Sequence, residues 1–293
     1  MKKEKYITLF LLISFSTMAQ IRGVVKDSIS KQPIPYVNIS VENENKGTTS
    51  EENGTFSIHV SEKSKNLIFS ALGFERKTVQ ISEVSEVNLK PIAYQLDEIV
   101  ISKRYETRAR EIGKPENQMF QAFDNGPRID TKFFPYFPSY QKTKFIKQVV
   151  IATDSRIEDA TFKIHFYCVD ENGFPNQEML TKDFVVSVSK GVKETKFNVT
   201  KFNLRMPKNG IFVGFEKLII EKNKLEKTTT DPNTNTTQTQ RTYFPFVLYN
   251  SVARDFLFVY SGGKWIKQTK QNLDNPTEKT LIYEPAINLI LTN

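Results

Sequence analysis

The two histidines are the first residues to test for chemistry, because a catalytic zinc ion needs three converging ligands and an open position. His59 and Glu62 form a His-x-x-Glu pair, and His165 is the only other histidine in the chain. Apolar and polar residues alternate around His59, which predicts a β-strand, and residues three apart on a strand point to opposite faces. His59 and Glu62 could share one ion only if the strand ended at Val60. We therefore predict no metal site and no cofactor.

Other catalytic motifs are missing from the sequence. There is no Gly-x-Ser-x-Gly motif, and Gly262-Gly263 leads into a strand pattern, not the helix of a phosphate-binding loop. The paired carboxylates read as surface turns, without the burial and separation of a glycosidase site; they are Asp97-Glu98, Glu158-Asp159 and Asp170-Glu171. Cys168 is the only cysteine and shares a strand face with Ile164 and Phe166, so we expect a buried, inert thiol. The chain is predicted not to be an enzyme.

Aromatic side chains are better candidates for binding. Residues 133–140 contain five aromatic side chains, and a lone tryptophan follows at Trp265. Such rings can stack on sugars, but large aromatics also dominate protein cores, so these rings could instead cap the open end of a sandwich. An exposed cluster of this size would exceed what a lone soluble domain normally shows to water. The candidate ligand-binding residues are Phe134, Tyr136, Phe137, Tyr140 and Trp265.

The elements that would position these residues begin with a β-rich stretch over residues 20–90. Val37, Ile39 and Val41 alternate with polar neighbours, as expected of a half-buried strand. Asn53-Gly54 is a strong turn signal between two such strands. Short alternating strands with turns at this spacing predict a small antiparallel sandwich.

This stretch also carries the marks of a known family, in order and at the family's spacing. The marks are Gly23, Val25, Asp27, Pro33, Ile34, Val37, Ile39, Gly47, Thr48, Gly54, Phe56, Ser70, Gly73 and Phe74. The stretch resembles the carboxypeptidase-like regulatory domain, a seven-stranded transthyretin-like sandwich common in exported Bacteroidetes proteins. Glu51 stands where an Asp is usual. The resemblance implies a module without catalysis of its own, and makes a zinc carboxypeptidase-related hydrolase only a remote alternative.

Residues 1–19 predict a secretory signal peptide. Lys2, Lys3 and Lys5 precede an apolar core at residues 7–15, which is too short to span a bilayer, and small residues precede Gln20. No other segment is long and apolar enough to be transmembrane in the mature chain. We therefore expect export to the periplasm, the outer membrane or the cell surface.

Residues 91–114 are predicted to be a linker with a short strand. The run at residues 96–101 is similar to the segment that follows the same domain in TonB-dependent receptors, which supports an envelope protein. Charged residues dominate 103–114, which predicts a connector or a short solvated helix ending at Gly113.

Residues 115–293 predict a second, larger sandwich, because many short strands follow at near-regular spacing. It resembles the uncharacterised jelly-roll-like sandwich partners of the regulatory domain, and the sequence leaves open a structural calcium ion within it. Residues 227–241 are rich in Thr, Asn and Gln and predict a flexible loop.

The fold class is therefore all-β, with two sandwiches. The net charge of +8 is scattered, and no basic stripe on a helix points to nucleic acid. We predict a non-enzymatic exported envelope protein that acts as a docking, scaffold or binding module. Its expected partner is an envelope protein or a surface polysaccharide, and the alternative function is that of a carbohydrate-binding accessory protein.

Overall fold

The computed structural model describes residues 19–61, 63–92, 104–115, 120–254, 256–269 and 281–293. These residues form 23 strands and four short 3-10 helices, so the predicted all-β class is confirmed. Within these ranges, no helix is long and apolar enough to cross a membrane. The predicted signal peptide and the run at residues 96–101 lie outside the described residues.

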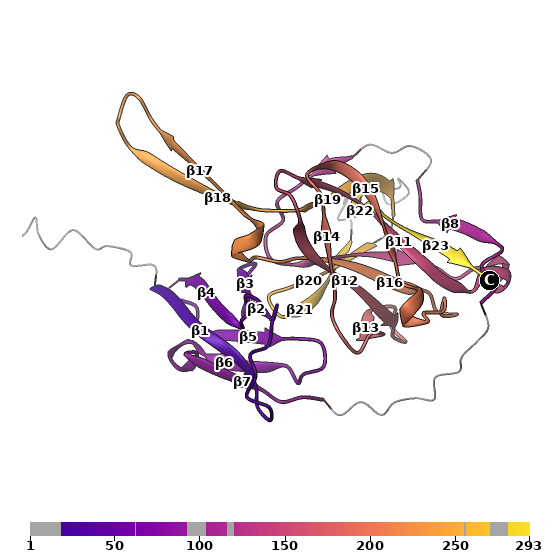
Figure 1. Cartoon of the computed structure of the whole chain (residues 1–293), viewed down its shortest axis with the longest axis horizontal. Helices are drawn as coiled ribbons and strands as arrows, with labels where there is room; N and C mark the ends of the chain where they lie inside the picture. Colours follow the sequence, from indigo (N-terminus) through magenta and orange to yellow (C-terminus); the bar gives the residue numbers. More distant parts are fainter. Residues whose placement is uncertain (1–18, 62, 93–103, 116–119, 255, 270–280) are drawn as a thin grey trace, which may run out of the picture.

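The first seven strands form the predicted N-terminal sandwich (Figure 1). One sheet has the order β4-β1-β7 and consists of β4 (Thr55–Val60), β1 (Ala19–Asp27) and β7 (Glu86–Leu89). The other has the order β3-β2-β5-β6 and consists of β3 (Gly47–Thr49), β2 (Asn38–Val41), β5 (Asn66–Ser70) and β6 (Lys77–Gln80). Alternate residues of β4 are buried, and Phe56 meets Phe69 of the facing sheet edge-on, with ring centroids 5.6 Å apart.

The larger sandwich contains two seven-stranded sheets. The first has the order β13-β12-β16-β10-β20-β21, with β14 also paired to β12: β13 (Pro175–Glu178), β12 (Ala160–Val169), β16 (Ile211–Lys217), β10 (Ile129–Phe134), β20 (Phe256–Ser261), β21 (Lys264–Thr269) and β14 (Phe184–Val188). The second has the order β22-β19-β11-β23-β8, with β15 paired to β11 and β9 paired to β19: β22 (Leu281–Pro285), β19 (Phe246–Ala253), β11 (Phe145–Ser155), β23 (Ile287–Thr292), β8 (Ala109–Ile112), β15 (Gly191–Asn198) and β9 (Gln121–Ala122). One large apolar core, which includes Phe162, Phe215 and Leu289, lies between them.

The charged segment before Gly113 is not a helix. Residues 109–112 form β8, which pairs antiparallel with β23 at the edge of the second sheet. Ile112 is the one buried side chain of this strand. The predicted short solvated helix is therefore wrong, because backbone pairing to an exposed sheet edge needs no apolar pattern on the added strand.

The Thr-rich segment also differs from its prediction as a flexible loop. Residues 224–243 form a two-stranded ribbon of β17 (Lys224–Thr230) and β18 (Thr237–Tyr243), which extends away from the sandwiches (Figure 1). Thr228 pairs with Thr239 and Thr230 with Thr237, and their hydroxyls lie 3.3 and 3.2 Å apart. β-branched Thr favours extended backbone, and cross-strand Thr pairs add to it, so a segment without apolar residues still forms strands.

Candidate functional site

The two sandwiches meet along a polar junction. Asn38 Nδ2 donates to Glu216 Oε1 at 2.6 Å, and Lys163 Nζ donates to the carbonyl oxygen of Tyr36 at 2.6 Å. The backbone N–H of Ile219 donates to Thr49 Oγ1 at 3.0 Å. Each bond joins the β2–β3 region of the small sandwich to the β12–β16 region of the large one.

A tight turn between β20 and β21 forms the other end of this junction. The carbonyl oxygen of Gly262 accepts from Asn43 N–H at 3.3 Å, and Ser261 Oγ donates to Asn45 Oδ1 at 2.9 Å. Gly262 has a φ of +57°, and a Cβ there would lie 3.1 Å from the Glu44 carbonyl oxygen. Glycine is therefore needed both for the left-handed backbone and for the close approach of the small sandwich.

A buried histidine stands at the centre of the junction. His165 Nδ1 lies 2.9 Å from Glu178 Oε2, and Nε2 lies 2.9 Å from Glu216 Oε2. Both ring nitrogens face carboxylates, which only accept hydrogen bonds, so both nitrogens must donate and the ring is an imidazolium. Burial lowers the pKa of His165, but the hydrogen bonds to Glu178 and Glu216 outweigh burial and raise the pKa to about 10.

The two glutamates have no free oxygen for chemistry. Glu178 Oε1 accepts from Phe166 N–H at 2.6 Å, and Glu216 Oε1 accepts from Asn38. Burial raises the pKa of Glu216, but the charge of Lys163 and the bonds from His165 and Asn38 lower it to about 2. Lys163 is itself paired to Asp183 at 2.8 Å. This cluster is a network within the large sandwich, and Asn38 and the Tyr36 carbonyl oxygen join the small sandwich to it.

The two histidines do not converge. His165 lines a junction cavity of about 190 Å³, whereas His59 is exposed on β4 and lines a separate cavity with Arg22 and Arg241. Glu62 lies outside the described residues. Within the described ranges, no group of three His, Cys, Asp or Glu side chains could hold a metal ion.

Cys168 is half-buried at the end of β12. Burial raises the pKa of its thiol, and the negative charge of Glu178 adds to this effect. The thiolate is therefore disfavoured, and the side chain is less buried than the sequence predicts; an inert thiol stays a prediction.

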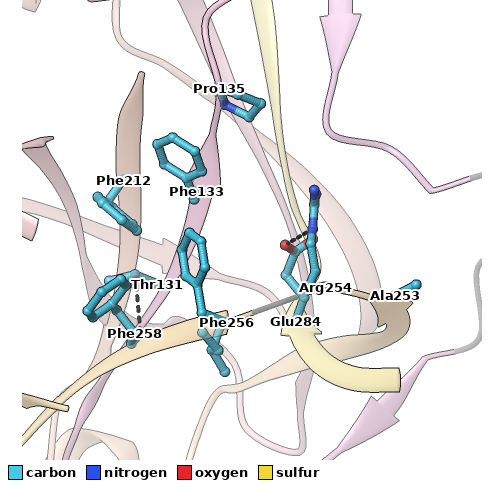
Figure 2. Close-up of a pocket in the computed structure, with 10 residues that line it drawn as sticks. Thr131, Phe133, Pro135, Phe212, Ala253, Arg254, Phe256, Phe258 and Glu284 are labelled. Atoms are coloured by element: carbon cyan, nitrogen blue, oxygen red, sulfur yellow. Dashed lines mark hydrogen bonds and ion pairs between the residues drawn. The ribbon is translucent and has the colours of Figure 1, made fainter. Parts of the chain in front are cut away.

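A cavity of about 310 Å³ opens on the larger sandwich, and four of its ten lining residues are phenylalanine (Figure 2). Phe133 of β10, Phe212 of β16, and Phe256 and Phe258 of β20 form its aromatic wall. The ring of Phe133 lies 4.9 Å from that of Phe212 and 6.1 Å from that of Phe256, centroid to centroid. The three strands are adjacent in one sheet, so the wall is built on rigid elements. We call this cavity the aromatic pocket.

Charged side chains line one side of the aromatic pocket. Arg254 Nε donates to Glu284 Oε1 at 2.9 Å, next to the Phe rings in Figure 2. Lys132 Nζ lies 3.0 Å from Glu284 Oε2 and donates to the Gly113 carbonyl oxygen at 2.6 Å. The Lys132 side chain is only 1% exposed, and burial lowers its pKa against the raising effect of Glu284. Apolar walls with a few fixed polar groups are the usual composition of a ligand site.

A fourth cavity, of about 350 Å³, carries exposed aromatic rings. Phe123 and Tyr283 are 37% and 45% exposed, with ring centroids 4.9 Å apart. Asn125 and Gln268 also line this cavity, and Asn125 Nδ2 donates to the hydroxyl of Tyr249 at 2.7 Å. An aromatic surface beside amide groups is suited to a polar ligand with an apolar face.

The structure separates the five aromatic residues that the sequence singles out. Phe134 and Tyr140 are buried in the main core, so neither ring is available to stack on a ligand. Tyr136 packs partly buried against that core, and Phe137 is 50% exposed beside Tyr140. Trp265 lies on β21, where its ring is 5.0 Å from that of Tyr167 in the junction. Ligand binding by Tyr136, Phe137 and Trp265 stays a prediction.

Most residues of the aromatic pocket are not among the candidate residues that the sequence predicts. Phe256 and Phe258 sit two apart on one predicted strand, which is a signal for a shared face. Phe133 and Phe134 are neighbours on a strand and therefore point to opposite faces, one to the pocket and one to the core. No local pattern connects Arg254 with Glu284, because the pairing of β19 with β22 in one sheet brings together residues thirty positions apart.

Comparison with known proteins identifies one part of the chain. No curated protein matches it. A chain of the infectious bursal virus derived T=1 particles matches at 9% identity with a TM-score of 0.25, covering 93% of this chain and 62% of that one, and this similarity carries no argument. Residues 21–101 match the family model of the CarboxypepD_reg-like domain. The N-terminal sandwich, as its motifs predicted, is a CarboxypepD_reg-like domain, a non-catalytic module.

Proposed function

We propose that this chain is a non-enzymatic binding module, in which the aromatic pocket takes a ligand and the CarboxypepD_reg-like domain is its rigid support. The observation that carries the proposal is the pocket itself. Its volume of about 310 Å³ falls at the lower end of the range for small-molecule sites, and its walls are mostly apolar with few polar groups. Its aromatic wall comes from three paired strands, so no ordering is needed before a ligand binds.

The polar junction favours a role for the small sandwich as the rigid support of the large one. Its hydrogen bonds connect β2 and β3 to β12 and β16, and a connection of this kind resists hinge motion. The module would be exported to the periplasm, the outer membrane or the cell surface of a Bacteroidetes cell, in line with the sequence of residues 1–19. Docking to an envelope protein is the scaffold form of the same proposal.

A neutral fluorescent probe, phenylnaphthylamine, tests the pocket in the chain that begins at Gln20. We expect saturable binding that falls at least about tenfold in Ala253→Trp, because Ala253 is exposed at the pocket wall and a large side chain there fills the space. Phe256→Ala should weaken binding by removing part of the aromatic wall. Phe137→Ala, which removes a half-exposed ring elsewhere, is the control. Undiminished binding in Ala253→Trp would show that the probe does not use the pocket.

Carbohydrate binding is a second candidate, favoured by the exposed rings of Phe123 and Tyr283 beside Asn125 and Gln268. Aromatic faces with amide donors nearby suit sugar rings. A glycan array tests this with Tyr283→Ala, Trp265→Ala and Phe137→Ala. Binding lost only in Tyr283→Ala assigns the site to the cavity that Tyr283 lines, whereas loss in Trp265→Ala assigns it to the tryptophan that the sequence predicts. An array without any binding would argue against this function for its glycans.

A further inference from the structure

We infer that the aromatic pocket selects ligands that combine one carboxylate with an apolar tail, either aromatic or acyl. The inference rests on the proposed function, because it names the ligand class of the same pocket. Its evidence is the charge balance of the side chains around the cavity and the orientation of their donors.

Two charged side chains line the pocket, Arg254 and Glu284, and two further cations lie next to it without lining it. Glu284 is the one carboxylate among its described lining residues, and it is shared by Lys132 and Arg254. A third cation, Lys267 of β21, places its Nζ 5.0 Å from the ring centroid of Phe256 and 5.8 Å from that of Phe258. Asp255 lies outside the described residues. The described groups therefore leave an excess of positive charge next to an apolar wall.

This excess favours an anionic ligand. Buried or half-buried charges are costly unless they are paired. Glu284 carries a single negative charge and can neutralise only one of its two cations. The Lys132 ammonium already has partners within the protein, because it contacts Glu284 and the Gly113 carbonyl oxygen. Arg254 differs, because its side chain is 41% exposed at the pocket. A ligand carboxylate would supply the missing negative charge at Arg254.

The donors of Arg254 have the geometry for such a group. Nε and Nη2 are directed to Glu284, at 2.9 and 3.5 Å, while no described residue accepts from Nη1. A guanidinium presents five N–H groups in a planar fork that matches a carboxylate. The hydroxyl of Thr131 is already used, because it donates to the Phe258 carbonyl oxygen at 2.6 Å. Arg254 is therefore the group that would hold the ligand head, with the tail against Phe133 and Phe256.

The test compares an acid with its own amide, so that shape is constant and charge is not. Calorimetry with hydrocinnamate and hydrocinnamide probes an aromatic tail, and octanoate with octanamide probes an acyl tail. We expect each acid to bind about tenfold more tightly than its amide, as a charge-assisted hydrogen bond provides. The acid that binds more tightly shows whether the pocket prefers an aromatic or an acyl tail.

Two matched variants assign the effect to Arg254. Arg254→Gln should remove the preference for the acid and leave amide binding unchanged. Arg241→Gln is the control, because Arg241 Nε donates to Glu226 at 3.0 Å in the same kind of pair, but on the distant β17–β18 ribbon. Ala253→Trp should abolish binding of acid and amide alike. An Arg254→Gln variant that keeps the acid preference would overturn the inference.

The remaining outcomes separate this inference from the proposed function. Equal affinity of the wild-type protein for acid and amide overturns the charge selection and retains the pocket as a binding site. If no acid binds but phenylnaphthylamine still does, only the inference fails. If neither acids nor phenylnaphthylamine bind, both the inference and the proposed function fail.

Discussion

Lys163 and Lys132 are two almost fully buried lysines of one sheet, and their surroundings affect them in opposite ways. Lys163 is 2% exposed in the junction, where burial lowers its pKa but the charges of Asp183 and Glu216 outweigh burial and raise it. Lys132 is 1% exposed beside the aromatic pocket, where burial outweighs Glu284 and its pKa is lowered. Carboxylates near Lys163 therefore outweigh the cost of burying its charge, whereas the single carboxylate near Lys132 does not.

This difference distinguishes the structural cluster from the proposed binding site. In the junction, both oxygens of Glu178 and of Glu216 accept hydrogen bonds from named protein donors, and Asp183 Oδ1 is the one buried carboxylate oxygen of the cluster without a partner among the described residues. At the pocket, one carboxylate serves two cations, and part of the Arg254 guanidinium is directed to no described residue. A ligand can add favourable contacts only where the protein has left them incomplete.

Removing a junction lysine should have the largest effect on stability. Lys163→Met leaves the partly buried Asp183 and the Tyr36 carbonyl oxygen without their cation, and breaking a buried pair costs about 3–5 kcal/mol, so we expect a loss near the lower end of this range. Urea unfolding followed by circular dichroism measures this loss. Lys26→Met, at the exposed pair with Glu86, is the control and should cost at most about 1 kcal/mol. Equal costs for the two variants would mean that the junction does not fasten the sandwiches.

Raising the pH should weaken the junction by a smaller amount. The pKa of His165 is about 10 in the folded protein against an ordinary value of 6.5, so its contribution is complete below pH 6.5 and is lost as pH rises towards 10. Between about pH 7 and about pH 9 the stability difference between wild type and His165→Gln should shrink by about 2 kcal/mol. Urea midpoints of both proteins across this range measure it. A difference that stays constant with pH would contradict a charged His165.

The smallest effect on stability is expected at the pocket. Arg254→Met leaves Glu284 still paired with Lys132, and the removed guanidinium is 41% exposed, so the cost should stay below about 1 kcal/mol. The same urea measurement gives this cost, with Lys163→Met as the contrasting variant. A loss as large as that of Lys163→Met would show that Arg254 has a structural role, and would argue against its role in the proposed ligand site.

Much of the fold could be predicted from the sequence, because its signals are local. The alternation of Phe56, Ile58 and Val60 is reproduced in the burial of β4, and the motif around Gly23 and Gly54 identified the first domain. Local signals also have limits. Low hydrophobicity suggested a loop at residues 227–241, although the β preference of threonine produces a ribbon there.

The candidate sites could not be predicted in the same way, because they depend on pairings between distant strands. His165 lies on a strand whose other residues are largely apolar, and its partners Glu178 and Glu216 are 13 and 51 residues away. One signal was present in the sequence: Lys163 and His165 alternate with Phe162, Ile164 and Phe166, so one face of this strand is polar. A polar face on a buried strand must be covered by polar groups. The sequence could not show that this cover is a second domain.

The placement of Trp265 allows its fluorescence to report on contact between the two sandwiches. It is the chain's single tryptophan, and its ring lies 5.0 Å from that of Tyr167 and 5.2 Å from that of Tyr260. The same ring lines the junction cavity together with Asn38 and Leu72 of the small sandwich. Parting of the two sandwiches would hydrate this indole while both β-sheet cores remain intact. A red shift in emission that precedes the loss of circular dichroism would therefore time the separation of the domains without any label.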